Sequence, residues 1–161
     1  MSDSALIDQF KQGLLTVLDE TFESVHGIFL DRKTSLFETL ATVSAEEASR
    51  PVGQQCATLA AQVEHMRFYI DMLMKYLQTG ENERVDWGEI WRTVSAVTPD
   101  EWEQSKTRLK DAYQRLTAMI KTYPDWGSAD AFAGAIGLAC HCAYHLGEIR
   151  QALCTVKNRE G

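Results

Sequence analysis

The chain has 161 residues, 45% of them hydrophobic and 24% charged, so we expect one domain, residues 1–161, with a sizeable core. The formal net charge of −7 argues against a nucleic-acid partner, which requires clustered lysine and arginine. No window approaches the roughly 18 to 20 apolar residues of a membrane span, and the polar start resembles no export signal. We therefore expect a cytoplasmic protein with no membrane partner.

The first predicted element is an amphipathic helix from residue 5 to about residue 25. Its apolar side chains recur at steps of three and four, as a helix with one buried face requires: Ile7, Phe10, Leu14, Leu18 and Phe22. Gly27 indicates the end of this helix, because glycine accepts the left-handed cap conformation. We expect His26 near the carboxyl end of the helix, outside any metal site.

A short helix is predicted from residue 34 to about 43, and Ser44-Ala45-Glu46-Glu47 has the form of a capping box that starts another turn. Residues 50–53 then break the chain. The second long helix is predicted from residue 54 to about 77. His65 lies on its apolar stripe, which also carries Thr58, Ala61, Phe68, Tyr69, Met72 and Tyr76.

Residues 78–98 are the least regular part and predict a long crossover, with a helical turn around residues 87–94. Thr98-Pro99-Asp100-Glu101 combines an N-cap, a proline at the first position and a capping-box glutamate, so the third long helix starts there. It ends before Pro124, and Ser128 caps a last helix to about residue 156. With only three prolines and no sustained β pattern, the sequence predicts an all-α fold: a four-helix bundle with a long crossover and extra short helices.

The last helix carries two histidines, His141 and His145, four residues apart. This spacing places both rings on one helix face, one turn apart. Each neutral imidazole offers one nitrogen lone pair, so the pair forms half of a metal site. The pattern alone is a weak signal and gains weight only if a third ligand faces it.

His65 is the candidate third ligand, because three of the four histidines then fall on inward stripes of two helices that are long enough to face each other. Three histidines would leave a divalent ion with open positions, which is the catalytic pattern. Nitrogen ligation suits Zn or Ni first, with Fe, Mn or Cu as alternatives. The alternative interpretation of His65 is a core histidine bonded to tyrosine or to backbone.

Other residues near the histidines have open roles. Glu148 shares their face and could be a fourth ligand, a partner of a ligand, a general base or a solvated glutamate. Glu148 or Tyr69 would assist proton transfer in an enzyme. Gly134 and Gly137 on the same helix predict either space for an ion and its substrate or a close approach of another helix.

The four cysteines are expected to be reduced, because we identify no export signal. Cys140 and Cys142 point in different directions around a helix, so they cannot share a ligand direction. We expect all four cysteines, these two with Cys56 and Cys154, to be packing residues.

Three segments resemble the DinB/YfiT-like superfamily of small helical bundles with a His triad, which are regarded as metalloenzymes. They are residues 40–51 (LATVSAEEASRP), residues 63–68 (VEHMRF) and residues 141–150 (HCAYHLGEIR). The resemblance covers roughly residues 5 to 156, and its most specific part is the closing HxxxHxG-x-IR segment together with the upstream histidine. It implies His65, His141 and His145 as metal ligands and a frequent homodimer. Many members carry Gln at the position of Glu148, which leaves the fourth ligand open.

The resemblance also implies a low-molecular-weight thiol cosubstrate, because some relatives are thiol S-transferases or a thiol-dependent isomerase. The leading prediction is therefore a metal-dependent enzyme that transfers a thiol to a small-molecule electrophile or hydrolyses a small-molecule substrate. Trp87 and Trp91 of the crossover would cover the mouth of its site. Two alternatives stay open: a protein that binds metal or a ligand without turnover, and a helical interaction module whose histidines are core residues.

Overall fold

The protein is all-helical over the residues that the computed structural model describes, which are 3–53, 56–81, 84–124, 126 and 128–158. Four long helices form the body of the molecule: α1 (Asp3–Phe22), α4 (Leu59–Thr79), α6 (Pro99–Thr122) and α7 (Ala129–Asn158). The connections contain three short helices: α2 (Leu36–Leu40), α3 (Ala45–Ala48) and α5 (Glu89–Thr93). None of the described helices has the length and apolar character needed to cross a membrane.

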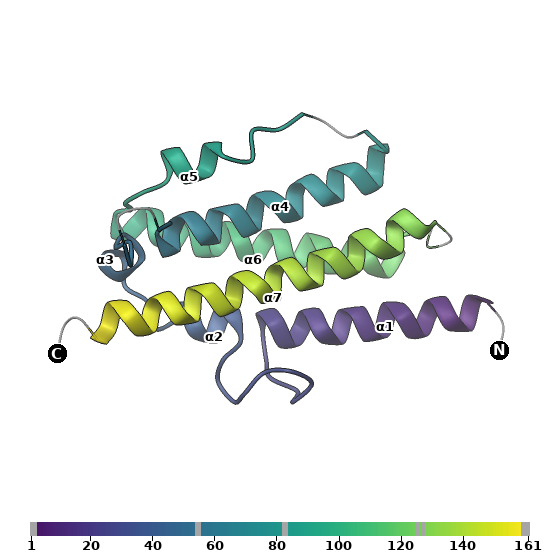
Figure 1. Ribbon diagram of the computed structural model, residues 1–161. Helices are drawn as coiled ribbons and strands as arrows, with labels where there is room; N and C mark the ends of the chain where they lie inside the picture. Colours follow the sequence, from purple (N-terminus) through teal and green to yellow (C-terminus); the bar gives the residue numbers. More distant parts are fainter. Residues whose placement is uncertain (1–2, 54–55, 82–83, 125, 127, 159–161) are drawn as a thin grey trace.

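The four long helices enclose one core. α1 packs against α6 and α7, and α4 packs against the same two helices. Figure 1 shows α4 and α6 running in one direction and α1 and α7 in the opposite direction, with α5 in the long crossover between α4 and α6. The apolar stripes of the four helices meet inside, where side chains such as Leu18, Met66, Leu116 and Leu146 are fully buried. Burial of these stripes is the main stabilising term of the fold.

The predicted helix starts are confirmed by their caps. Thr98 accepts a hydrogen bond from the backbone N–H of Glu101, whose carboxylate accepts from the backbone N–H of Thr98 at 2.7 Å. The predicted capping box at Ser44 is also present and starts α3. Ser128 caps α7, because its hydroxyl accepts from the backbone N–H of Ala131 at 3.1 Å.

Several predicted boundaries were wrong. The first helix ends at Phe22 instead of residue 25, and the chain beyond it folds back so that the backbone N–H groups of His26 and Ile28 donate to the Glu20 carboxylate. The short helix covers only Leu36–Leu40, since Ser35 forms a capping box with Glu38. The second long helix begins after Thr58, whose hydroxyl accepts from the backbone N–H of Ala61. Its predicted start at residue 54 lies outside the described residues.

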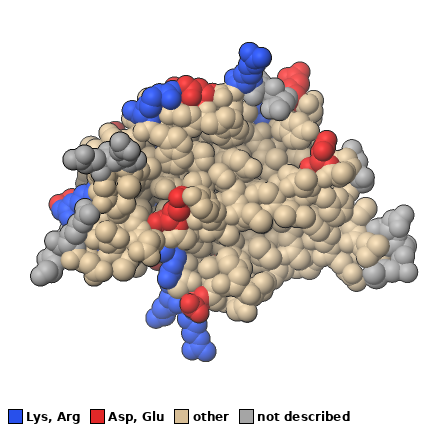
Figure 2. Space-filling model, viewed as in Figure 1, with Lys and Arg blue, Asp and Glu red and all other residues tan. Residues whose placement is uncertain are grey.

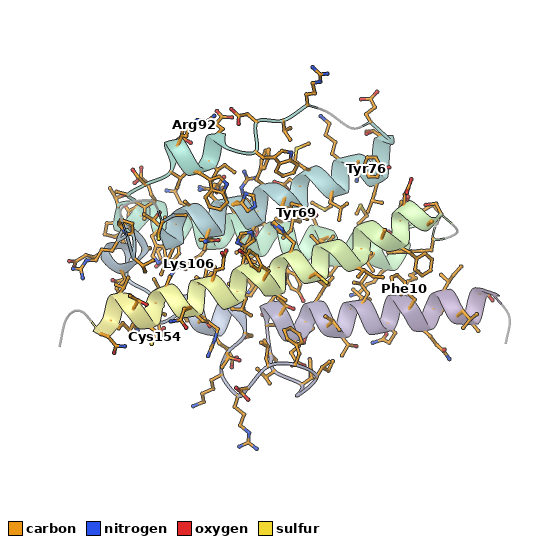
Figure 3. The ribbon with its side chains drawn as sticks, viewed as in Figure 1. Phe10, Tyr69, Tyr76, Arg92, Lys106 and Cys154 are labelled. Carbon is orange, nitrogen blue, oxygen red and sulfur yellow. The ribbon has the colours of Figure 1, made fainter. Side chains whose placement is uncertain are left out.

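The cysteine prediction was wrong in part. All four thiols are free, but only Cys142 is buried; Cys56, Cys140 and Cys154 are exposed. Figure 3 shows Cys154 on the outer side of α7, whereas Phe10 lies between α1 and α7. Phe10 packs there against Trp126 and Phe132, with ring centroids 5.4 and 4.3 Å apart. Cys140 and Cys154 lie on the surface of α7 and Cys56 lies in the connection before α4, so a burial preference alone misplaced three of the four.

Candidate metal centre

Three histidine rings converge between α4 and α7. His65 comes from α4, and His141 and His145 come from successive turns of α7. Each ring offers a nitrogen, and the three nitrogens lie within 4.8 Å of one another. Two nitrogens that bind one ion at about 2.1 Å are at most about 4.2 Å apart, so a small side-chain rotation would let these rings share an ion. The predicted convergence of residues from two helices is confirmed.

Burial keeps these rings neutral. His65 and His145 are only 6% and 5% exposed. Burial lowers the pKa of His65 to about 4, and neighbouring His145 lowers it further while Glu148 opposes the shift. Burial, with His145 and His65, likewise lowers the pKa of His141 to about 4, and burial also lowers the pKa of His145. A neutral ring keeps the lone pair that a metal ion needs.

Two ring nitrogens in this cluster have no hydrogen-bond partner among the residues that the structure describes. They are Nδ1 of His65 and Nε2 of His141, and both are buried. A buried polar atom without a partner costs free energy, and native proteins rarely leave one unless a ligand or ion satisfies it. The alternative in which His65 is a core histidine bonded to tyrosine or backbone does not account for this atom. The donor set of three neutral imidazoles therefore fits a divalent transition metal.

The third ring is held by polar partners. Nδ1 of His145 lies 2.5 Å from Oε1 of Gln62 and 2.9 Å from Oε2 of Glu148. The other oxygen of Glu148 accepts from the Tyr144 hydroxyl at 2.6 Å. Because both neighbours of Nδ1 are oxygen acceptors, the proton belongs on Nδ1 and the lone pair on Nε2. Partners of this kind orient a metal-binding histidine and raise its basicity.

Aromatic rings pack around the other two histidines. Tyr69 stacks on His141, with ring centroids 3.8 Å apart and planes 17° apart. Figure 3 places Tyr69 in the middle of the molecule, between α4 and α7. Trp91 of α5 lies 4.4 Å from His65, and Trp87 lies 5.8 Å from Tyr69. Burial, helped by Cys142, raises the pKa of Tyr69, so its hydroxyl keeps its proton at neutral pH.

The two predicted glycines differ in their surroundings. A Cβ added at Gly134 would lie 3.4 Å from Leu73, so this glycine sits where α7 meets α4. A Cβ added at Gly137 would meet nothing within 4 Å. Close approach of α4 therefore accounts for Gly134, whereas Gly137 faces open space. The fourth histidine, His26, lies elsewhere and contacts Asp19 at 2.6 Å, as expected of a residue outside the site.

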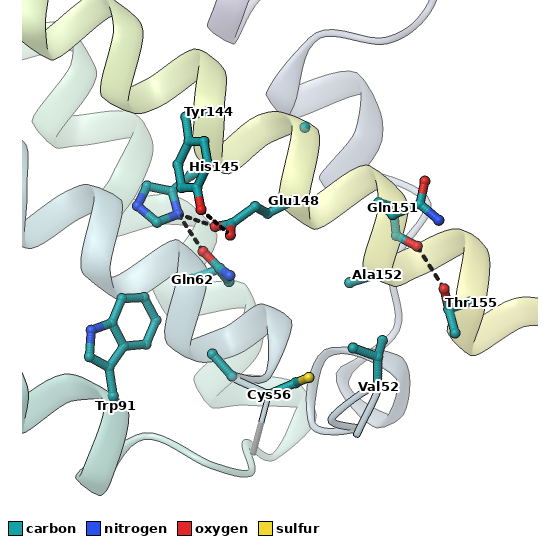
Figure 4. A pocket seen from close by; sticks show the side chains of 12 residues that line it. Val52, Cys56, Gln62, Trp91, Tyr144, His145, Glu148, Gln151, Ala152 and Thr155 are labelled. Atoms are coloured by element: carbon teal, nitrogen blue, oxygen red, sulfur yellow. Dashed lines mark hydrogen bonds and ion pairs between the residues drawn. The ribbon is translucent and has the colours of Figure 1, made fainter. Parts of the chain in front are cut away.

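A cavity of about 1000 Å³ opens beside the histidines. Figure 4 shows it from close by, with Trp91, Gln62 and His145 toward one end and Thr155 and Val52 toward the other. Glu148 and Cys56 lie between these ends, on opposite walls. Of the three clustered histidines, His145 is the one among the described residues that line this cavity.

Sequence analysis missed Gln62 and Tyr144. Gln62 precedes His65 by three residues and so faces the same side of α4, a spacing that could have identified it. Tyr144 precedes Glu148 by four residues, which is also a same-face spacing, and its hydroxyl reaches that carboxylate although the side chain is 62% exposed. Comparison with known proteins adds no further assignment: no protein-family model, curated protein or solved structure matches this chain.

Proposed function

We propose that this protein is a divalent-metal enzyme whose ion is held by His65, His141 and His145. The observation that supports the proposal is the convergence of three neutral rings, two of them buried and one half-buried, with an orphaned nitrogen on two of the three. Zn or Ni suits this nitrogen donor set best, with Fe, Mn or Cu as alternatives. The adjacent cavity of about 1000 Å³ favours an enzyme over a closed structural metal site, because its wall includes His145 and a substrate in it would lie beside one of the three ligands.

The family assignment is also a proposal. We propose a DinB/YfiT-like four-helix bundle, in which the long crossover joins two helices of the same direction. The packing of α1 and α4 against both α6 and α7 supports the bundle, and α5 lies in the crossover. The position of the three histidines on two of these helices agrees with the family's His triad.

The reaction we favour is transfer of a low-molecular-weight thiol to an electrophile, with hydrolysis as the second choice. A divalent ion bound at such a site acts as a Lewis acid and lowers the pKa of the group it binds. Glu148 is placed to accept a proton, because its carboxylate lies at the cavity wall and contacts His145. Tyr69, whose hydroxyl stays protonated at neutral pH, would donate one.

Turnover with defined thiols tests this proposal. Metal-loaded protein is assayed with glutathione-, bacillithiol- and mycothiol-type thiols plus an electrophile, and separately with hydrolysable esters. We expect thiol transfer that falls at least tenfold in Glu148→Gln and in Tyr69→Phe, which keeps the stacked ring. Glu103→Gln, at an exposed position of α6, is the matched control. Binding of metal without any turnover would instead support the non-catalytic alternative.

We also propose a homodimer, with α7 as the contact surface. Exposed positions in the middle of α7 that do not line the cavity are all uncharged: Ala133, Ile136 and Cys140. Figure 2 shows that the face presented by α7 has few charged side chains, while lysine and arginine lie mostly at its margins. A helix that is apolar on its outer side calls for a partner. Sedimentation should show a dimer that Ile136→Lys dissociates and Gln114→Lys, on exposed α6 surface, does not.

A further inference from the structure

The cavity beside the histidines follows α7 for about three turns. Residues at steps of three and four along this helix line it, from Tyr144 and His145 through Gly147 and Gln151 to Thr155. Ten residues of helix separate His145 from Thr155, which corresponds to about 15 Å. The opposite wall is built from Val52, Cys56 and Ala57. A ligand that starts at the histidines would therefore be elongated and would lie along α7 (Figure 4).

The walls of this cavity carry very little charge. Among the described residues that line it, none is lysine or arginine, and the one carboxylate is Glu148. Glu148 is already engaged by His145 and the Tyr144 hydroxyl, and so lies closer to the histidines than to Thr155. The far end offers the hydroxyl of Thr155, which donates to the backbone carbonyl of Gln151. A negatively charged group at that far end would lose its water without gaining a charged partner.

We propose that the substrate of this site is a monoanionic amphiphile: one anionic head atom at the histidine cluster and a neutral, largely apolar tail along α7. The inference rests on the proposed metal function for the head, because only an ion on the three histidines supplies positive charge there. The tail is inferred independently, from the uncharged walls and from the length of the cavity. The same walls disfavour a charged group at the far end of the cavity.

Hydroxamates provide probes with a fixed metal-binding head and a variable tail. Binding to zinc- or nickel-loaded protein is measured by calorimetry for three of them: acetohydroxamate, octanohydroxamate and the monohydroxamate of octanedioic acid, which ends in a carboxylate. Each fully buried methylene group adds about fourfold to affinity. Because the cavity is open on one side, we expect octanohydroxamate to bind at least tenfold more tightly than acetohydroxamate. The carboxylate tip should remove most of that gain.

A charge placed at the far end tests the position of the tail. Thr155→Lys should raise the affinity for the carboxylate-tipped probe at least threefold and leave the affinity for acetohydroxamate unchanged. Thr107→Lys is the matched control, because it adds the same net charge at an exposed position of α6. The hydroxyl of Thr107 also donates to a backbone carbonyl four residues earlier, that of Glu103. The control should restore nothing.

The outcomes separate the two proposals. If acetohydroxamate fails to bind because the protein holds no metal, the proposed function fails. If acetohydroxamate binds but the eight-carbon tail adds less than threefold, or the carboxylate tip costs nothing, the amphiphile inference is overturned while the metal function stands. Equal rescue by Thr155→Lys and Thr107→Lys would also overturn it, because the tail would then not lie along α7.

Discussion

Glu20 and the histidine cluster differ in how their buried polar atoms are satisfied. Glu20 is fully buried, and its carboxylate accepts hydrogen bonds from four backbone N–H groups, those of His26, Ile28, Phe29 and Leu30. The histidine cluster is also buried, yet two of its ring nitrogens have no partner. A satisfied buried charge holds a loop in place, whereas an unsatisfied buried lone pair indicates a ligand. We therefore expect a structural role for Glu20 and a ligand-binding role for the histidines, where two orphaned nitrogens lie in one cluster.

The largest expected effect is on the structural side. Glu20→Gln replaces one carboxylate oxygen by an N–H₂ group, which faces backbone donors instead of accepting from them. We expect it to lower the melting temperature more than any substitution at the histidine cluster does, without changing metal content. The control is Glu103→Gln, which removes only a surface ion pair with Lys106. A Glu20→Gln protein as stable as the control would show that the loop does not depend on this carboxylate.

The same carboxylate predicts a pH dependence. Burial acts to raise the pKa of Glu20, but the backbone N–H groups of Phe29, Ile28, Leu30 and His26 lower it to about 2, below its ordinary value of 4.5. Its contribution to stability is therefore complete above pH 4.5 and is lost as the pH falls toward 2. Urea unfolding of the wild type and of Glu20→Gln should show a difference that is constant near neutral pH and shrinks below pH 4.5. A difference that grows on acidification would contradict the assignment.

Metal should stabilise the protein by a smaller but substantial amount. A ligand that binds only the native state at a hundredfold excess over its Kd adds about 2.7 kcal/mol. For a domain of this size that corresponds to a rise in melting temperature of about 5 to 10 °C. His141→Ala should abolish the rise, while His26→Ala, at the histidine outside the cluster, should keep it. An equal rise in both variants would place the metal elsewhere.

The partners of His145 should tune metal affinity without being ligands. Gln62→Ala and Glu148→Gln each alter the polar contacts that hold Nδ1, so each should weaken metal binding by about 10- to 100-fold. Competition with a chromophoric chelator measures this. Gln114→Ala, at an exposed position of α6, should leave the affinity unchanged. No loss in either variant would mean that Nδ1 needs no fixed partner.

The smallest expected effect is an increase in stability from replacing a glycine of α7. A Cβ added at Gly147 meets nothing within 4 Å, and glycine inside a helix costs up to about 1 kcal/mol relative to alanine. Gly147→Ala should therefore raise the melting temperature by about 2 to 4 °C, with metal content unchanged. Gly134→Ala should gain less, because its Cβ would contact Leu73 on α4. The reverse order would show that crowding at the α4–α7 contact does not oppose the substitution at Gly134.

The sequence predicted what depends on local periodicity and capping. The Thr98 and Ser128 caps and the facing of His65, His141 and His145 follow from spacing along helices, and the structure confirms them. What it could not predict depends on contacts between distant residues. The bond from the Trp102 indole N–H to the carbonyl oxygen of Val43, at 2.8 Å, joins residues 59 positions apart. The turn of the loop onto Glu20 likewise has no signature in one helix alone.

The central claim is that one ion is held by imidazoles from α4 and α7. Elemental analysis of untagged protein, dialysed after loading with zinc or nickel, tests it most directly. The account predicts close to one ion per chain in the wild type and background levels in both His65→Ala and His141→Ala, with helical content unchanged. Wild-type protein that retains no metal, or variants that retain as much as the wild type, would contradict it.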